Sequence, residues 1–192
     1  MTSPILSRRT RSRSWLQGKQ KSGFAGFTIA PGDSGSVSSF ATELKAGENG
    51  DITFRHGRIP PGSYLVFVAW DDKSIEWRWI DVTNEAEIRV DLAVDPAAVG
   101  ELEVTIPASA KDRRVHLLPL DGTGQLPKAA GSATSLAIQL GNYFKGSHIE
   151  AAAGQNSVKF TAIRAGKYRA IAGDMTADVE VAVGKPAKTT LK

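Results

Sequence analysis

Apolar and polar residues alternate along most of the chain, and a helical period is nearly absent. The alternation is clear over residues 88–92, 101–106 and 179–183, as in half-buried strands. Residues 64–70 are apolar on both faces, which is typical of a central strand that is covered on both sides. Gly, Pro, Asn and Asp residues separate these runs. The pattern therefore predicts an all-β protein.

A strand-turn-strand phrase occurs twice in the sequence. In the first copy, strand residues 52–54 are followed by Pro-Pro-Gly-Ser-Tyr at 60–64. In the second copy, residues 158–160 are followed by Ala-Gly-Lys-Tyr at 165–168. An apolar strand comes after each Gly-x-Tyr. A phrase that is repeated at a domain-sized offset predicts two tandem copies of one β-module.

The residues of this phrase serve the fold rather than a reaction. Gly62 and Gly166 lack a Cβ atom, which lets the chain turn sharply between strands. Tyr64 and Tyr168 then begin a strand, with the ring in the core and a hydroxyl group that can reach the backbone of the loop.

The segment Asp-Pro-Ala-Ala-Val-Gly at 95–100 is the predicted boundary between the modules. Module one would span residues 23–97, and module two would span residues 98–192. Residues 23–50 contain few apolar residues, so a truncated or divergent front would leave module one incomplete. In module two, the Ala- and Gly-rich connection over residues 122–154 predicts a mobile surface loop.

Phe54 and the run Ile-Pro-Pro-Gly-Ser-Tyr at 59–64, with the apolar strand after it, resemble the carboxypeptidase regulatory-like domain. Asn-Gly-Asp at 49–51 stands where that family has an Asp/Asn-Gly turn. The resemblance implies a transthyretin-like or Ig-like β-sandwich of about seven strands in two packed antiparallel sheets. The second copy departs from the family pattern, because Arg164 and Ala165 stand where the prolines would be. In bacteria such modules are commonly strung along cell-envelope and secreted proteins, so the resemblance implies that location.

Basic residues gather at the N-terminus. Residues 1–22 hold six basic residues and no acidic one, which leaves 18 basic and 20 acidic residues in the rest of the chain. A basic, Ser-rich segment with few apolar residues predicts a disordered tail. Because no basic stripe continues into the modules, we expect no nucleic-acid partner. Polar residues 10–13 follow Arg8 and Arg9 where an export signal would be apolar, so no signal peptide is visible and a cytoplasmic location stays open.

Length and composition exclude several kinds of site. The 192 residues suffice for one large domain or two small ones. No stretch approaches the ~20 apolar residues that a membrane span needs. The chain has no cysteine, which excludes disulfides, thiolate zinc sites and a cysteine nucleophile together.

The spacing of the polar residues predicts neither a metal site nor a catalytic group. His56, His116 and His148 lie far apart in different motifs, so structural or surface roles are expected for them. Gly-Asp-Ser-Gly at 32–35 matches the surroundings of a protease serine, but it lacks suitably placed His and Asp partners and is interpreted as a turn. Asp-Asp at 71–72 is interpreted as a charged turn rather than a cation site. We expect no enzyme, no metal and no cofactor.

Three tryptophans within ten residues, Trp70, Trp77 and Trp79, form the sharpest candidate site. The repeat aligns Trp77 and Trp79 with Asp178 and Glu180, which are outward-facing positions. Two neighbouring tryptophans are therefore predicted to face away from the core of module one. Exposed aromatic rings can stack on sugar rings or dock a neighbouring domain. Packing within or between modules, contact with a partner protein and carbohydrate binding all stay open.

Together the features predict a non-catalytic structural or protein-interaction module, which acts as a spacer or binding domain in a bacterial envelope or multidomain protein. The expected partner is a protein or a neighbouring domain. The alternative function is a carbohydrate-binding module that uses Trp70, Trp77 and Trp79.

Overall fold

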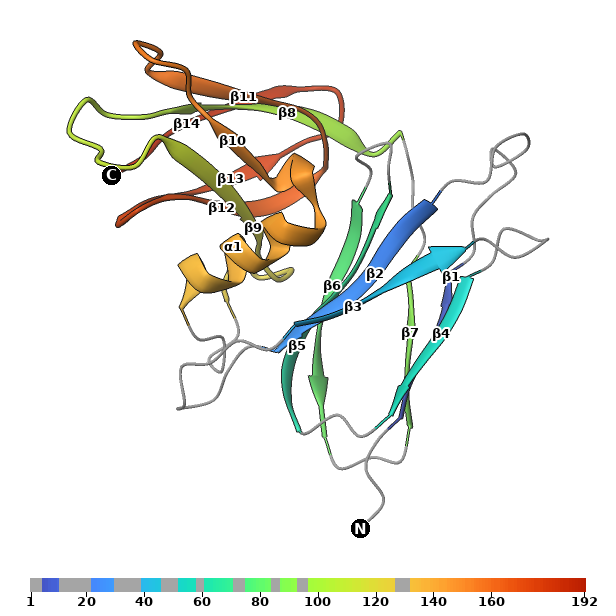
Figure 1. Ribbon diagram of the computed structural model, residues 1–192. Coiled ribbons are helices and arrows are strands. Elements are labelled where there is room, and N and C mark those ends of the chain that lie inside the picture. Colours follow the sequence, from blue (N-terminus) through green and yellow to red (C-terminus); the bar gives the residue numbers. More distant parts are fainter. Residues whose placement is uncertain are drawn as a thin grey trace. The chain divides into compact units, whose positions relative to one another are not determined.

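The computed structural model divides into two compact units (Figure 1). Unit 1 comprises Met1–Asp95 and Ala129–Gly131, and unit 2 comprises Pro96–Lys128 and Ser132–Lys192. The structure describes residues 5–10, 22–29, 39–45, 52–57, 61–70, 75–83, 87–92, 97–126 and 132–192.

Unit 1 is built from two β-sheets. Its strands are β1 (Ile5–Thr10), β2 (Ser22–Ile29), β3 (Ser39–Lys45), β4 (Ile52–Gly57), β5 (Gly62–Trp70), β6 (Ile75–Val82) and β7 (Glu87–Asp91). One sheet has the strand order β4-β1-β7, and the other has the order β3-β2-β5-β6.

Unit 2 is also built from two β-sheets, with one α-helix. Its elements are β8 (Val99–Thr105), β9 (Arg114–Pro119), α1 (Ala133–Tyr143), the short 3-10 helix η2 (Lys145–Ser147), β10 (His148–Glu150), β11 (Ser157–Arg164), β12 (Gly166–Ala172), β13 (Met175–Val181) and β14 (Pro186–Thr190). The sheet orders are β11-β8-β14 and β10-β9-β12-β13.

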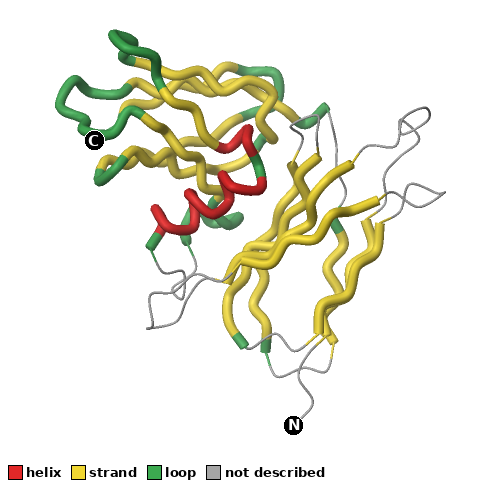
Figure 2. The backbone as a smooth tube through the Cα atoms, viewed as in Figure 1, coloured by secondary structure: helices red, strands yellow, loops and turns green. Residues whose placement is uncertain are grey.

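The two units have the same strand order. Advancing every strand label of unit 1 by seven gives the order of unit 2 in both sheets. The described parts of both units consist mostly of strands (Figure 2). In each unit the first strand lies at the centre of the three-stranded sheet, antiparallel to the fourth strand and parallel to the last. The predicted fold class is thus confirmed as a mainly β protein with several antiparallel pairings. Within the described ranges, no helix is long and apolar enough to cross a membrane.

Strand β5 lies at the centre of the described core of unit 1. Residues 64–68 are all buried, so both faces of β5 are covered, as the continuous apolar run predicts. On one face, Tyr64 and Val66 pack against apolar residues of β6 and β7. Burial raises the pKa of Tyr64 to about 12.

Alternating residues of β8 contribute to the core of unit 2. Leu102 and Val104 are buried, as is Ile106 directly after the strand, and the intervening residues are more exposed. The core extends to Tyr168 of β12, whose hydroxyl group donates a hydrogen bond to the carbonyl oxygen of Arg164 at 2.6 Å. In the second copy of the repeated phrase, the tyrosine hydroxyl therefore reaches the backbone at the end of β11, next to the turn.

The structure differs from the sequence-based expectation at the N-terminus. Composition predicts a disordered tail over residues 1–22, whereas Ile5–Thr10 forms β1 and β2 begins at Ser22. Strand β1 pairs with β4 on one side and β7 on the other, and this tertiary pairing outweighs the local composition. Unit 1 therefore has an opening pair of strands, which the sequence did not reveal. Residues 11–21 of the predicted tail lie outside the described residues.

The connection between β9 and β10 also differs from expectation. The described part of residues 122–154 contains α1, η2 and β10 rather than a plain surface loop. Helix α1 begins after Ser132, whose hydroxyl oxygen accepts a hydrogen bond from the backbone amide of Ser135 at 3.4 Å. Leu136 and Leu140 are buried, and α1 packs against β9. Apolar side chains at helical spacing thus order this segment.

Candidate functional site

The His, Asp and Glu residues that the structure describes do not gather into a metal centre. No group of three or more His, Cys, Asp or Glu residues among them could hold a metal ion. The Gly-Asp-Ser-Gly run at 32–35 and the Asp pair at 71–72 lie outside the described residues.

Four apolar side chains share one face of the four-stranded sheet of unit 1. Leu65 is the register partner of Trp79, and Phe67 is the partner of Trp77. Directly opposite residues project from the same side of a sheet, and Tyr64 on the other side of β5 belongs to the inter-sheet core. Leu65, Phe67, Trp77 and Trp79 therefore form one surface, here called the outer face of unit 1.

Two of the three predicted site residues lie on this outer face. Trp77 is 9% exposed and Trp79 is half-buried. Trp70 is the last residue of β5 and pairs with Gly23 of β2, and its side chain is outside the described residues. Trp77 and Trp79 thus project away from the inter-sheet core, and the ring of Trp77 is largely covered.

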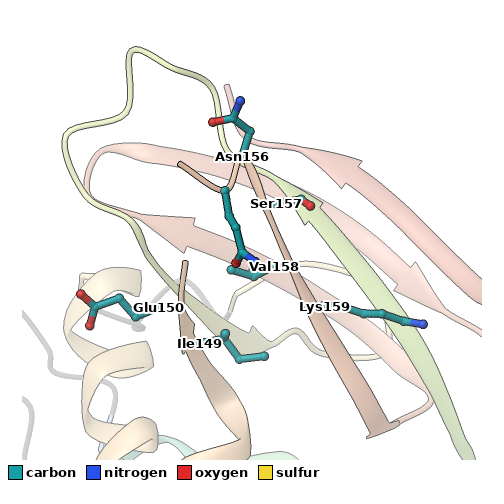
Figure 3. A pocket seen from close by; sticks show the side chains of 7 residues that line it. Ile149, Glu150, Asn156, Ser157, Val158 and Lys159 are labelled. Carbon is teal, nitrogen blue, oxygen red and sulfur yellow. The ribbon is translucent and has the colours of Figure 1, made fainter. Parts of the chain in front are cut away.

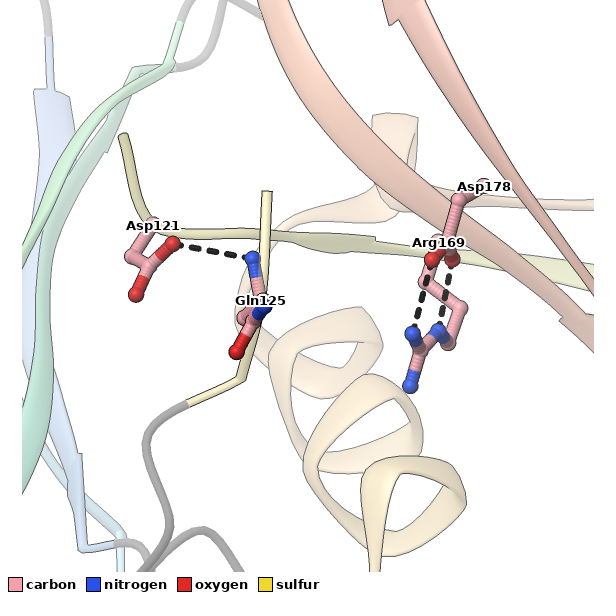
Figure 4. Close-up of polar contacts among 4 residues, drawn as sticks. All are labelled: Asp121, Gln125, Arg169 and Asp178. Carbon is pink, nitrogen blue, oxygen red and sulfur yellow. Dashed lines mark hydrogen bonds and ion pairs between the residues drawn. The ribbon is translucent and has the colours of Figure 1, made fainter. Parts of the chain in front are cut away.

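The equivalent face of unit 2 carries an ion pair (Figure 4). Strand β12 begins with the same Gly-x-Tyr phrase as β5, so Arg169 occupies the position of Leu65, and its register partner Asp178 that of Trp79. Nε and Nη2 of Arg169 donate to the two carboxylate oxygens of Asp178 at 2.6 and 2.8 Å. These hydrogen bonds raise the pKa of Arg169. The same framework position is apolar in one unit and charged in the other.

A pair of histidines, here called the histidine pair, lies between the sheet of unit 2 and α1. His116 of β9 and His148 of β10 are register partners, and their rings stack with centroids 5.5 Å apart and planes at 27°. The Nδ1 atoms of both rings are buried and have no hydrogen-bond partner. A Cβ atom on Gly141 of α1 would lie 3.0 Å from Nδ1 of His148 and 3.6 Å from Nδ1 of His116. The missing side chain of Gly141 therefore allows the close approach of the helix.

The surroundings of the histidine pair disfavour a positive charge on His116. Burial lowers the pKa of His116, and the neighbouring His148 and Arg114 lower it further, against the smaller opposing effects of Asp112 and of a hydrogen bond with the backbone of Ala137. Sequence reasoning missed the pair because the two histidines are far apart in the chain. Only the register of β9 and β10 brings them together.

A hollow of about 520 Å³ lies at the edge of unit 2 between β10 and β11 (Figure 3). It is lined by Ile149 and Glu150 and by residues 155–159. Its two charged side chains are already engaged, because Glu150 forms an ion pair with Arg114 at 2.6 Å and Lys159 forms one with Glu101 at 2.7 Å. The hollow thus presents no free charge that would select a ligand.

Asp121 organises the turn after β9. Its carboxylate accepts a hydrogen bond from the backbone amide of Gln125 at 2.9 Å (Figure 4). It also accepts hydrogen bonds from the backbone amide of Thr123 at 2.9 Å and from the Thr123 hydroxyl group at 2.6 Å. The Thr123 hydroxyl group makes the largest contribution to lowering the pKa of Asp121. This is a local Asp turn, and its role is structural.

No family model and no curated protein matches the sequence. Among solved structures, the minor pilin GBS52 of Streptococcus agalactiae is 10% identical with a TM-score of 0.34, over 98% of this chain and 94% of that chain. The shaft pilin SpaA of Lactobacillus rhamnosus GG is 11% identical with a TM-score of 0.31, over 99% and 97%. A putative adhesin of Bacteroides ovatus is 13% identical with a TM-score of 0.29, over 98% and 90%. These structural similarities are distant.

Proposed function

We propose that the protein is a non-catalytic structural spacer, whose two units are tandem copies of one β-sandwich module. The observation that carries this function is the parallel pairing of the first and last strands in each unit. Strand β1 pairs with β7 over five residue pairs, and β8 pairs with β14 over five. Because these strands run in the same direction, the chain enters each unit at one end of the pair and leaves at the other.

This arrangement suits a module that transmits tension. A force on the two ends of a unit acts along the parallel strands, so their ladder hydrogen bonds are loaded together rather than opened one by one. Strands also rise by about 3.3 Å per residue, so each such pair separates the entry and exit points of its unit by a distance on the order of 15 Å. Such modules can be strung end to end along a longer protein.

Two further features support the proposal of tandem copies. The units have the same strand order, and the Gly-x-Tyr phrase begins the fifth strand of each. We place the junction in the segment 95–100 and keep the carboxypeptidase regulatory-like family as the proposed origin of both copies. The envelope or the exterior of a bacterial cell is the location in which a load-bearing spacer would act.

A single-molecule pulling experiment on unit 2 tests the spacer function. The chain has no cysteine, so a pair of cysteines can define the points of attachment. Attachment at Ala97→Cys and Lys192→Cys loads the β8–β14 pair along the strands. Attachment at Lys167→Cys and Glu180→Cys, which are register partners, opens the β12–β13 hairpin from its end. We expect a clearly higher unfolding force for the first geometry, and equal forces would refute a load-bearing role.

We also propose that the outer face of unit 1 packs against a neighbouring domain or a partner protein. The burial of Trp77 favours packing against protein and disfavours an open sugar-binding platform. Acrylamide quenching of tryptophan fluorescence, compared with the variants Trp77→Phe and Trp79→Phe, tests this proposal. Weak quenching with blue-shifted emission is expected. Strong quenching that falls in the variants would instead favour the alternative carbohydrate-binding platform.

A further inference from the structure

The histidine pair holds two basic nitrogens out of contact with solvent. A buried polar atom without a hydrogen-bond partner costs about 1–3 kcal/mol, and such atoms are rare in folded proteins. Here the Nδ1 atoms of His116 and His148 are both in this state. Because the rings stack nearly parallel, their in-plane lone pairs do not point at each other. Neither a proton shared between the two nitrogens nor a metal ion bridging them fits this geometry.

The elements around the histidine pair offer little to balance a positive charge. Helix α1 contains no charged residue. The charged residues on the other elements near the pair are Arg114 on β9, Asp112 two residues before it, Glu150 on β10 and Arg169 on β12. The carboxylates among them are engaged, because Glu150 accepts a hydrogen bond from Arg114 and Asp112 accepts one from the Arg114 backbone amide. Arg169 is likewise held by Asp178.

We propose that α1 is a pH-released cover, which packs on β9 while His116 is neutral and detaches when His116 takes up a proton. The charge on His116 would lie beside the stacked ring of His148 and against a helix without a carboxylate. The helix has 11 residues, and a helix of that length is marginal in water by itself. Its order therefore depends on packing that protonation opposes.

The direction of the pH dependence follows from linkage. With α1 in place, the pKa of His116 lies below its ordinary value, and a ring exposed to water by opening returns to about 6.5. The open state, in which α1 is detached, then binds more protons than the closed state, in which α1 packs on β9. The closed state is fully favoured above about pH 6.5, and it loses stability as the pH falls below that value.

Opening of α1 would also change the surface of unit 2. Leu118 lies two residues along β9 from His116, on the same face, and Ile171 of β12 is the register partner of His116. Both side chains are fully buried with α1 in place. Detachment would expose these two apolar side chains on the outer face of unit 2, next to the ion pair of Arg169 and Asp178. This inference goes beyond the spacer function and does not depend on it.

Amide hydrogen exchange of the full chain between pH 7.5 and pH 5.0, corrected for intrinsic exchange rates, tests the proposal. Protection of α1 should fall by up to about tenfold per pH unit below pH 6.5, as expected for one added proton. Protection of β8 should stay constant. In the double variant His116→Phe, His148→Phe, which keeps two stacked rings, α1 should lose this pH dependence. His56→Gln removes the third histidine as the matched control and should behave as the wild type.

A constant protection of α1 in the wild type would overturn the proposal, and so would an equal fall in the double variant. A second measurement needs no variant and covers the case in which the double variant does not fold. Nuclear magnetic resonance titration of the imidazole protons should give a pKa below 6.5 for His116, with the amide signals of α1 shifting at the same midpoint. An ordinary pKa for His116, with α1 signals that do not follow it, would equally refute the cover.

Discussion

Units 1 and 2 place different side chains at equivalent positions of the same framework. The cross-strand pair on the outer face of unit 1 is Leu65 with Trp79, and the equivalent pair in unit 2 is Arg169 with Asp178. The strand order is the same in both units. The same strand order therefore tolerates different chemistry on the outer faces of the two units.

The connection between the second and third strands is the other main difference. In unit 1 it spans residues 30–38, whereas in unit 2 it spans residues 120–147 and contains α1. The helix packs against β9 on the side of the histidine pair. An insertion at one connection of the framework thus gives unit 2 a cover for its outer face without altering the strand order.

The largest expected effect comes from the apolar outer face of unit 1. Phe67→Ala should destabilise unit 1 by about 3–5 kcal/mol, because Phe67 is fully buried. Urea unfolding followed by tryptophan fluorescence reports unit 1 alone, since residues 96–192 contain no tryptophan. Ile171→Ala at the equivalent position of unit 2 is the matched control and should leave this signal unchanged. An unaltered midpoint of urea unfolding for Phe67→Ala would show that the outer face contributes nothing to the stability of unit 1.

A smaller effect is expected where α1 meets the histidine pair. Gly141→Ala should weaken the packing of α1 by about 1–3 kcal/mol, because the new Cβ atom would meet Nδ1 of His148 at 3.0 Å. Alanine raises helix propensity by about 1 kcal/mol, which opposes the effect. Asn142→Ala, at an exposed position of the same helix, is the control. Hydrogen exchange of α1 measures both variants, and stronger protection in Gly141→Ala would contradict the close contact.

The tyrosine of the repeated phrase should make a moderate contribution to the stability of unit 2. Tyr168→Phe removes the hydrogen bond to the carbonyl oxygen of Arg164 and should cost about 1 kcal/mol. Thermal unfolding followed by circular dichroism gives the change in stability of unit 2. A variant as stable as the wild type would mean that water replaces the hydroxyl group at no cost.

The ion pair on the outer face of unit 2 should have the smallest effect. Asp178→Asn should cost less than about 1 kcal/mol, because both side chains are partly exposed and solvent screens their attraction. The difference from the wild type should shrink as the salt concentration rises. Chemical unfolding at low and high salt measures it. If Asp178→Asn instead lowers the free energy of unfolding by several kcal/mol even at high salt, the ion pair stabilises unit 2 as much as the apolar pair stabilises unit 1.

Trp77 and Trp79 project away from the inter-sheet core, although the sequence repeat aligns them with unit 2 two residues out of register. The two-residue period of a strand explains why this shift leaves the predicted orientation unchanged. The sequence repeat equated Trp77 with Asp178, whereas the strand register equates Trp79 with Asp178. The shift arises because residues 71–74 connect β5 to β6, while two residues suffice between β12 and β13, where Gly173 has a φ of 60°. A shift of two residues keeps every side chain on the same face.

The sequence by itself determined the mainly β character, the buried central strand β5 and the role of Tyr168, because local alternation and turn residues encode them. Only the tertiary structure decided the place of β1, since a basic segment becomes a strand through its partners β4 and β7. The same holds for the histidine pair, which depends on the register of β9 with β10 and on the approach of α1 at Gly141. Contacts between residues that are distant in the chain leave no periodic trace in the sequence.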